Sequence, residues 1–137
     1  MKDKQSIVVK CKDFLVSKSE VKFAYVFGSF IKSEMPRDLD IAIYLGERKI
    51  NTLKYVLKIG QELSRVLLPL GVTPDVKVLN NAPLYFHYEV IKEGKPILVR
   101  NQKERIEYEA KIIIEYLDFL PLLREYNKLM RDKIRSW

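Results

Sequence analysis

Hydrophobic and polar positions repeat along the chain with two different periods, and the two periods predict helices and strands in alternation. Apolar residues return every three to four positions within residues 3–17, 50–68 and 82–92, which predicts amphipathic helices. β-Prone runs at residues 21–27, 39–45, 72–80 and 96–99 predict strands. Residues 29–37 between the first two strands are expected to form a loop that opens with a helical turn. This order is typical of an α/β or α+β domain.

In the second predicted strand, the alternation of side chains assigns each residue to a face. Leu39, Ile41, Ile43 and Leu45 form an apolar face, which is expected to pack on the core. Asp38, Asp40, Ala42 and Tyr44 form the other face. Both aspartates are therefore expected to point away from the packed side of the sheet.

The C-terminal segment, about residues 102–137, has a helical pattern with two apolar stripes. One stripe comprises Ile106, Ala110, Ile113, Leu117 and Leu120; the other comprises Ile112, Tyr116, Phe119, Leu123, Tyr126, Met130, Ile134 and Trp137. One stripe can pack on the domain, and the other predicts a surface for a partner or for self-association. Pro121 lacks an N–H group and is expected to kink or split the helix near Leu120.

Composition narrows the class of protein. A chain of 137 residues, 47% hydrophobic and 31% charged, is expected to be one soluble domain, residues 1–137. No apolar run reaches the roughly 20 residues of a membrane span, and the first residues do not resemble a secretory signal. The single cysteine, Cys11, excludes an internal disulfide and favours a cytoplasmic location with Cys11 as a packing residue. The net charge of +7 permits a nucleic acid, a nucleoside triphosphate or an acidic partner, but the lysines are not clustered as in a dedicated nucleic-acid site.

The candidate metal-binding residues lie at the beginning of the second predicted strand. Asp38 and Asp40 are one residue apart on a strand, so their side chains share a face and their charges repel. A divalent cation removes this conflict, and Mg²⁺ combines one or two carboxylates with water and substrate phosphates. The Gly28-Ser29 turn upstream offers backbone N–H groups to phosphates, and Asp75 on the third strand supplies another carboxylate. The pattern predicts a site for a metal and a nucleotide, although neither G-x-x-x-x-G-K-[ST] nor G-x-G-x-x-G is present.

These motifs resemble a known family. FGSFIKSEMPRDLDIAIYL followed by PDVKVLN is similar to the minimal nucleotidyltransferases of the DNA polymerase β superfamily. More narrowly, DVKVLNNAPLYFHYEVIKEGKPIL and EYLDFLPLLREY resemble the MntA-type antitoxin adenylyltransferases, which are paired with HEPN-domain toxins. The resemblance implies a small mixed β-sheet flanked by helices. The chain differs from the family in two places. Its loop between Ser29 and Asp38 is short, and Ser33 stands where the family often has glycine.

The resemblance also implies an activity and roles for individual residues. The activity is transfer of AMP from ATP, with Mg²⁺, to a tyrosine of a HEPN ribonuclease toxin, which silences the toxin. By resemblance the triphosphate is held by Gly28 and Ser29, with Lys32 as a phosphate contact or simply a solvated lysine. The metal and catalytic residues implied are Asp38, Asp40 and Asp75.

Two other functions stay open at this point. An antitoxin that acts by occlusion alone needs no catalysis and uses the second stripe of the C-terminal helix, which is also a candidate for homo-oligomer formation. A nucleotidyltransferase that modifies RNA or a small hydroxyl compound is the other alternative. Two further residues have alternative interpretations. Tyr44 is a core residue or a nucleobase contact, and His87, the only histidine, is expected to be a helix-packing residue rather than a catalytic one.

Overall fold

The computed structural model describes residues 3–34, 36–46 and 49–136, and its elements match the predicted order. The elements are α1 (Lys4–Val16), β1 (Phe23–Phe27), α2 (Ser29–Lys32), β2 (Asp38–Tyr44), α3 (Thr52–Leu67), the 3₁₀ turn η1 (Leu68–Leu70), β3 (Thr73–Val78), α4 (Leu84–Glu93), β4 (Lys95–Val99) and α5 (Gln102–Arg135). Each predicted helix and strand before residue 100 is present, with ends displaced by one or two residues. Among the described residues, no helix has both the length and the apolar character needed to cross a bilayer.

The four strands form one mixed sheet in the order β3-β2-β1-β4. The central strand β1 is antiparallel to β2 and to β4, whereas β2 is parallel to β3. A parallel pair needs a crossover, and α3 supplies it on one face of the sheet. The prediction of a small mixed sheet flanked by helices is confirmed.

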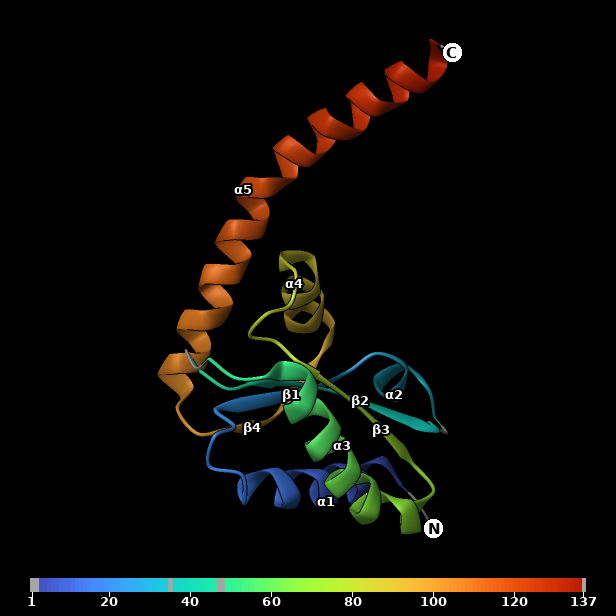
Figure 1. Ribbon diagram of the computed structural model, residues 1–137, viewed down its shortest axis with the longest axis vertical. Helices are drawn as coiled ribbons and strands as arrows, with labels where there is room; N and C mark the ends of the chain where they lie inside the picture. The colour runs from blue at the N-terminus through green and yellow to red at the C-terminus, as the bar shows by residue number, and fades with distance from the viewer. Residues whose placement is uncertain (1–2, 35, 47–48, 137) are drawn as a thin grey trace.

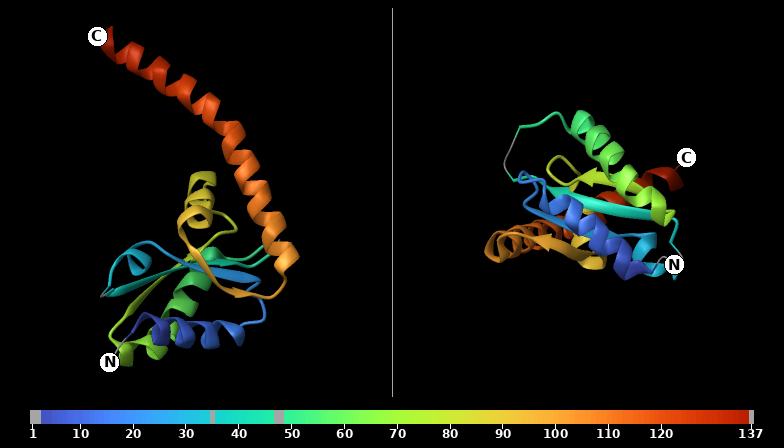
Figure 2. Two further views of the ribbon diagram at one scale, coloured as in Figure 1. Left: turned by 180° about the vertical axis from the view of Figure 1, so that it is seen from behind. Right: turned by 90° about the horizontal axis from the view of Figure 1, so that it is seen from below.

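One face of the sheet is covered by α1 and α3, which lie side by side below it in Figure 1 and are seen again in Figure 2. Leu39, Ile41 and Ile43 of β2 point to this face and are fully buried, as the alternation predicted. Cys11 of α1 is buried in the same core, where burial raises the pKa of its thiol to about 12. Its interpretation as a packing residue is confirmed.

The opposite face is covered by α4 and the first part of α5, over a cluster of aromatic rings. Phe23 stacks on Tyr44 with ring centroids 4.7 Å apart, and Tyr108 of α5 lies 5.1 Å from both rings. The hydroxyl of Tyr25 donates to Glu109 of α5 at 2.5 Å. The face that carries the aspartates is therefore packed as well, farther along β2. The interpretation of Tyr44 as a core residue is confirmed.

Helix α5 runs without a break through Pro121, so of the two expected outcomes, a kink or a split, the split does not occur. Its axis bends along its length, as Figure 1 shows, in line with the expected kink. Only the first part packs on the body: Ile112 is buried, and the ring of Tyr116 stacks on Tyr88 of α4 at 3.9 Å.

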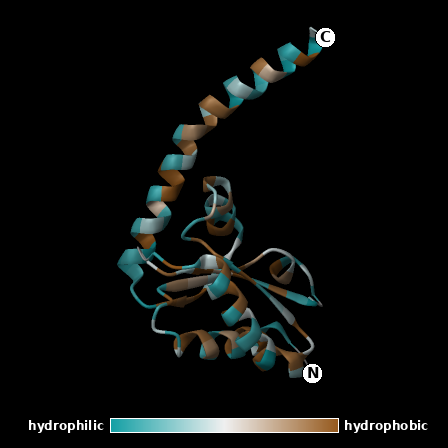
Figure 3. Ribbon diagram, viewed as in Figure 1, coloured by the Kyte–Doolittle hydropathy of each residue, from teal (hydrophilic) through white to brown (hydrophobic). Residues whose placement is uncertain are grey.

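The rest of α5 projects away from the body and carries exposed large hydrophobic side chains. Figure 3 shows that hydrophobic residues, in brown, alternate with hydrophilic ones along this part of the ribbon. These include Leu117, Phe119, Leu122, Tyr126, Leu129, Met130 and Ile134. Trp137, the last member of the predicted second stripe, lies outside the described residues. The predicted apolar surface on this helix is therefore present, and it is longer than the domain needs for its own core.

Candidate active site

The turn from β1 into α2 places backbone against a carboxylate. Gly28 has φ of 71°, in the left-handed region that favours glycine. A Cβ atom at this position would lie 2.5 Å from Oδ2 of Asp40, which is closer than real atoms approach. Ser29, the next residue, directs its backbone N–H toward the same carboxylate. The Gly-Ser pair is thus fitted to Asp40 by both conformation and space.

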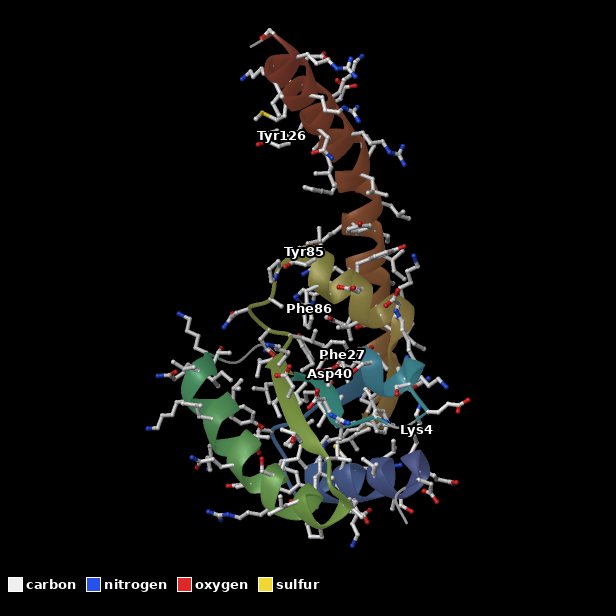
Figure 4. The ribbon with its side chains drawn as sticks, turned by 90° about the vertical axis from the view of Figure 1, so that its right-hand side faces the viewer. Lys4, Phe27, Asp40, Tyr85, Phe86 and Tyr126 are labelled. Carbon is white, nitrogen blue, oxygen red and sulfur yellow. The ribbon has the colours of Figure 1, made fainter. Side chains whose placement is uncertain are left out.

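Asp40 lies at the middle of the candidate site. In the sheet it is opposite Phe27 of β1 on one side and Asp75 of β3 on the other. Figure 4 shows Asp40 beside Phe27, with Phe86 of α4 above them. The structure therefore brings Gly28, Ser29, Asp40 and Asp75 together, as the sequence predicted.

The charge of Asp40 is in conflict with its surroundings. Burial, first, and then the neighbouring charges of Asp75 and Asp38 raise the pKa of Asp40 above 3.8. A hydrogen bond with Asp75 acts in the same direction, and the Ser29 N–H partly opposes the rise. Two carboxylates that face one another in this way favour a shared proton or a bound cation.

The donor set fits Mg²⁺, because carboxylate oxygens are its preferred protein ligands and the cation would remove the repulsion between Asp40 and Asp75. Asp38 is on the same face at the start of β2 and is exposed. As their side chains stand, the described residues contain no group of three His, Cys, Asp or Glu arranged to hold a metal ion. The assignment of all three aspartates to a metal therefore stays a prediction.

Two lysines on elements that form the site make ion pairs with carboxylates. Lys32 is in the last turn of α2, and its Nζ is 3.6 Å from Oε2 of Glu93 in α4. Lys77 is not among the predicted site residues, yet its Nζ is 3.7 Å from Oδ1 of Asp75. The alternation of β3 contained the signal, since residues two apart on a strand share a face.

His87 is a structural residue. It is buried, its Nδ1 lies 2.5 Å from the Tyr108 hydroxyl, and its Nε2 lies 3.1 Å from the Ala82 carbonyl oxygen. Burial lowers its pKa. With both ring nitrogens occupied, the helix-packing interpretation is confirmed.

A cavity of about 810 Å³ opens at the other end of β2, between the sheet, α4 and α5. Its lining includes Tyr44, His87 and Tyr108, and none of the three aspartates. The size of this cavity does not make it the candidate catalytic site, because the three aspartates and the Gly28-Ser29 turn are not part of its lining.

The fold and the carboxylates together define a nucleotidyltransferase of the polymerase β type. The family model described as polymerase beta, nucleotidyltransferase matches residues 9–103, more than half of the chain. The chain therefore belongs to the polymerase β nucleotidyltransferase family, and the prediction of that family is confirmed. Comparison with curated proteins gives no significant match.

Solved structures share the fold over nearly the full length. The tri-AMPylated Shewanella oneidensis HEPN toxin in complex with MNT antitoxin gives a TM-score of 0.71 at 21% identity, over 96% of this chain and 98% of the matched chain. The MntA–HepT toxin–antitoxin gives 0.69 at 21% identity, over 95% and 98%. A toxin–antitoxin structure with AMP-PNP gives 0.67 at 20% identity, over 91% and 98%. At these identities the likeness shows the fold.

Proposed function

We propose that this protein is a Mg²⁺-dependent adenylyltransferase and the antitoxin of a HEPN ribonuclease toxin, which it neutralises by transferring AMP from ATP to a tyrosine. The observation that carries the proposal is the contact of the Gly28-Ser29 turn with Asp40, beside Asp75, in a member of the nucleotidyltransferase family. The similar structures support the choice of acceptor, since one contains an AMPylated HEPN toxin and another an ATP analogue. The proposed place of action is the cytoplasm, where ATP is available.

Each site residue has its own role in the proposed reaction. The Gly28-Ser29 turn binds the triphosphate, with Lys32 as a further phosphate contact. Asp38, Asp40 and Asp75 would hold Mg²⁺, which supplies charge stabilisation for the entering and leaving oxygens. The tyrosine oxygen of the acceptor forms a bond to the α-phosphorus, the bond to the β-phosphate oxygen breaks, and pyrophosphate leaves with the electron pair. Asp75 would accept the phenolic proton, and the chain otherwise acts by positioning.

The test uses the purified toxin and antitoxin with α-labelled ATP and Mg²⁺. Label should appear on the toxin, and both Asp38→Asn and Asp40→Asn should remove nearly all of it. Asp13→Asn, an exposed aspartate on α1, is the matched control. Equal labelling by the Asp40→Asn protein would refute the assignment. Parallel reactions with RNA and an aminoglycoside would identify the alternative acceptors.

A second function, neutralisation by occlusion, is favoured by the exposed apolar surface of α5. Leu122 and Tyr126 are 70% and 59% exposed on the projecting part of the helix. Under occlusion alone, Asp40→Asn would still suppress toxicity, whereas Leu122→Glu with Tyr126→Glu would not. The two functions are compatible, because a protein adenylyltransferase must also dock its substrate.

A further inference from the structure

Lys4 at the start of α1 contacts α2, the short helix that follows the Gly28-Ser29 turn. Its Nζ donates a hydrogen bond to the carbonyl oxygen of Ile31 in α2 at 3.0 Å. The same ammonium lies 5.7 Å from the centre of the Phe30 ring, and Phe30 is buried. Figure 4 shows Lys4 on the opposite side of α2 from Phe86 and the upper helices.

Helix α2 needs such a contact, because it has only four residues and cannot stabilise itself. Its internal bonds are few: the N–H of Ile31 donates to Gly28 at 3.1 Å and the N–H of Ser33 to Ser29 at 2.8 Å. The last carbonyls of a helix have no partner within it, and Lys4 supplies one for Ile31.

Helix α1, which carries Lys4, is held in place by core packing and by an N-terminal cap. Ile7, Cys11 and Leu15 bury one side of the helix in the core, and the Asp3 carboxylate caps its first turn through the N–H of Ser6 at 2.7 Å. The other charged link of α2, from Lys32 to Glu93, is longer and more exposed. Lys4 is therefore the better-defined polar link between α2 and the body.

We propose that Lys4 is a positioning residue for catalysis: it fixes α2, and through α2 it holds the Gly28-Ser29 turn against Asp40 in the geometry that receives the triphosphate. This inference rests on the proposed function for the role of the turn. Lys4 itself is separated from the carboxylates by α2 and makes no contact with them.

The test compares Lys4→Met with the conservative Lys4→Arg and with Lys10→Met, an exposed lysine on the same helix. Hydrogen exchange followed by mass spectrometry reports on residues 28–33 without any nucleotide. Lys4→Met should exchange faster there by roughly tenfold, Lys4→Arg should restore slow exchange, and Lys10→Met should resemble the native chain. Unchanged exchange in Lys4→Met would overturn the proposal. Lys4→Gln is the second variant should Lys4→Met fold poorly.

The consequence for the site is measured by titration with AMP-PNP and by steady-state kinetics. We expect Lys4→Met to weaken AMP-PNP binding by roughly three- to tenfold and to raise KM for ATP more than it lowers kcat. Faster exchange together with native affinity would disprove the link to the nucleotide. If the native chain binds no nucleotide, the proposed function fails and the link to the nucleotide with it, whereas the exchange experiment still decides whether Lys4 fixes α2.

Discussion

Asp40 approaches Gly28 so closely that position 28 has no room for a side chain: a Cβ atom on Gly28 would lie 2.5 Å from Oδ2 of Asp40. The contact joins the end of β1 to the middle of the carboxylate face of β2. Because Gly28 also has φ of 71°, no L-residue fits there without strain. The glycine thus allows the turn to approach the carboxylate closely.

Gly28→Ala should therefore cost both stability and activity. We expect the free energy of unfolding to fall by about 1–3 kcal/mol and nucleotidyl transfer to be lost, since the turn or Asp40 must move. Gly60→Ala in α3 is the control, because its Cβ would meet nothing within 4 Å. It should stabilise the protein by about 0.5–1 kcal/mol and leave transfer unchanged. Urea unfolding and the labelling assay measure both; equal stability of the two variants would contradict this explanation.

Replacing Asp40 should stabilise the metal-free protein at neutral pH. The folded pKa of Asp40 is raised above its unfolded value, so its favourable contribution is present below about pH 3.8 and is lost as pH rises through the folded pKa. At pH 7 the ionised carboxylate opposes Asp75 across the strands. We expect Asp40→Asn to raise the free energy of unfolding by about 0.5–1 kcal/mol at pH 7, and the gain to vanish near pH 3.

Thermal unfolding with EDTA, repeated across this pH range, measures the effect. Asp13→Asn on the exposed side of α1 should show no comparable pH-dependent gain. Adding Mg²⁺ should stabilise the native chain more than the Asp40→Asn chain. A gain from Asp40→Asn that is independent of pH would contradict the charge explanation.

Lys77 should weaken the affinity of the site for a free divalent cation. Its ammonium is 3.7 Å from Asp75, with the two side chains 53% and 54% exposed, so the ion pair is modest and competes with a metal for the carboxylate. Lys77→Gln should raise Mn²⁺ affinity by roughly two- to fivefold, in line with an exposed pair of 0.2–1 kcal/mol. Calorimetry without nucleotide measures it, with Lys12→Gln on α1 as the control. An unchanged affinity would show that Lys77 does not compete.

The sequence predicted which face of a strand each side chain occupies, but not which strands lie side by side. Alternation assigned Leu39, Ile41 and Ile43 to the core and both aspartates of β2 to the other face, and the structure agrees. That Asp75 faces Asp40 depends on which strands pair and in which register, and periodicity within a strand carries no such information. The combination of motifs suggested this neighbourhood, and the family resemblance assigned Asp75 its role there.

Long-range polar contacts were beyond sequence reasoning. Arg100, just after β4, donates to the carbonyl oxygens of Val21 at 2.6 Å, Val16 at 2.9 Å and Lys18 at 2.9 Å, and thereby closes the end of α1. The partners are about 80 positions away, so no local spacing marks them. Whether Pro121 would kink or split α5 stayed open for a related reason: a proline removes one helical hydrogen bond, but its surroundings decide between a bend and a break.

Arg100 should contribute measurably to stability through these carbonyls. Arg100→Met removes the guanidinium hydrogen bonds to the carbonyls at the end of α1 and should lower the free energy of unfolding by about 1–3 kcal/mol. Arg100→Lys should recover part of the loss, because an ammonium reaches fewer acceptors than the guanidinium fork. Arg124→Met on the projecting part of α5 is the control and should change stability by less than about 0.5 kcal/mol. Chemical unfolding of the three variants decides the matter; a native-like Arg100→Met would show that water replaces the guanidinium at no cost.

Pro121 should set the bend of α5 without affecting the stability of the body. Pro121→Ala restores an N–H group that can donate to the carbonyl of Leu117, so the helix should straighten. Because the described residues beyond it are exposed, apart from the half-buried Leu123, the free energy of unfolding should change by less than about 0.5 kcal/mol. Spin labels at positions 103 and 133, separated by about 45 Å along a straight helix, should move apart in the Pro121→Ala chain. An unchanged distance would assign the bend to another cause, and Leu129→Ala, on the same projecting part, controls for general effects of substitution there.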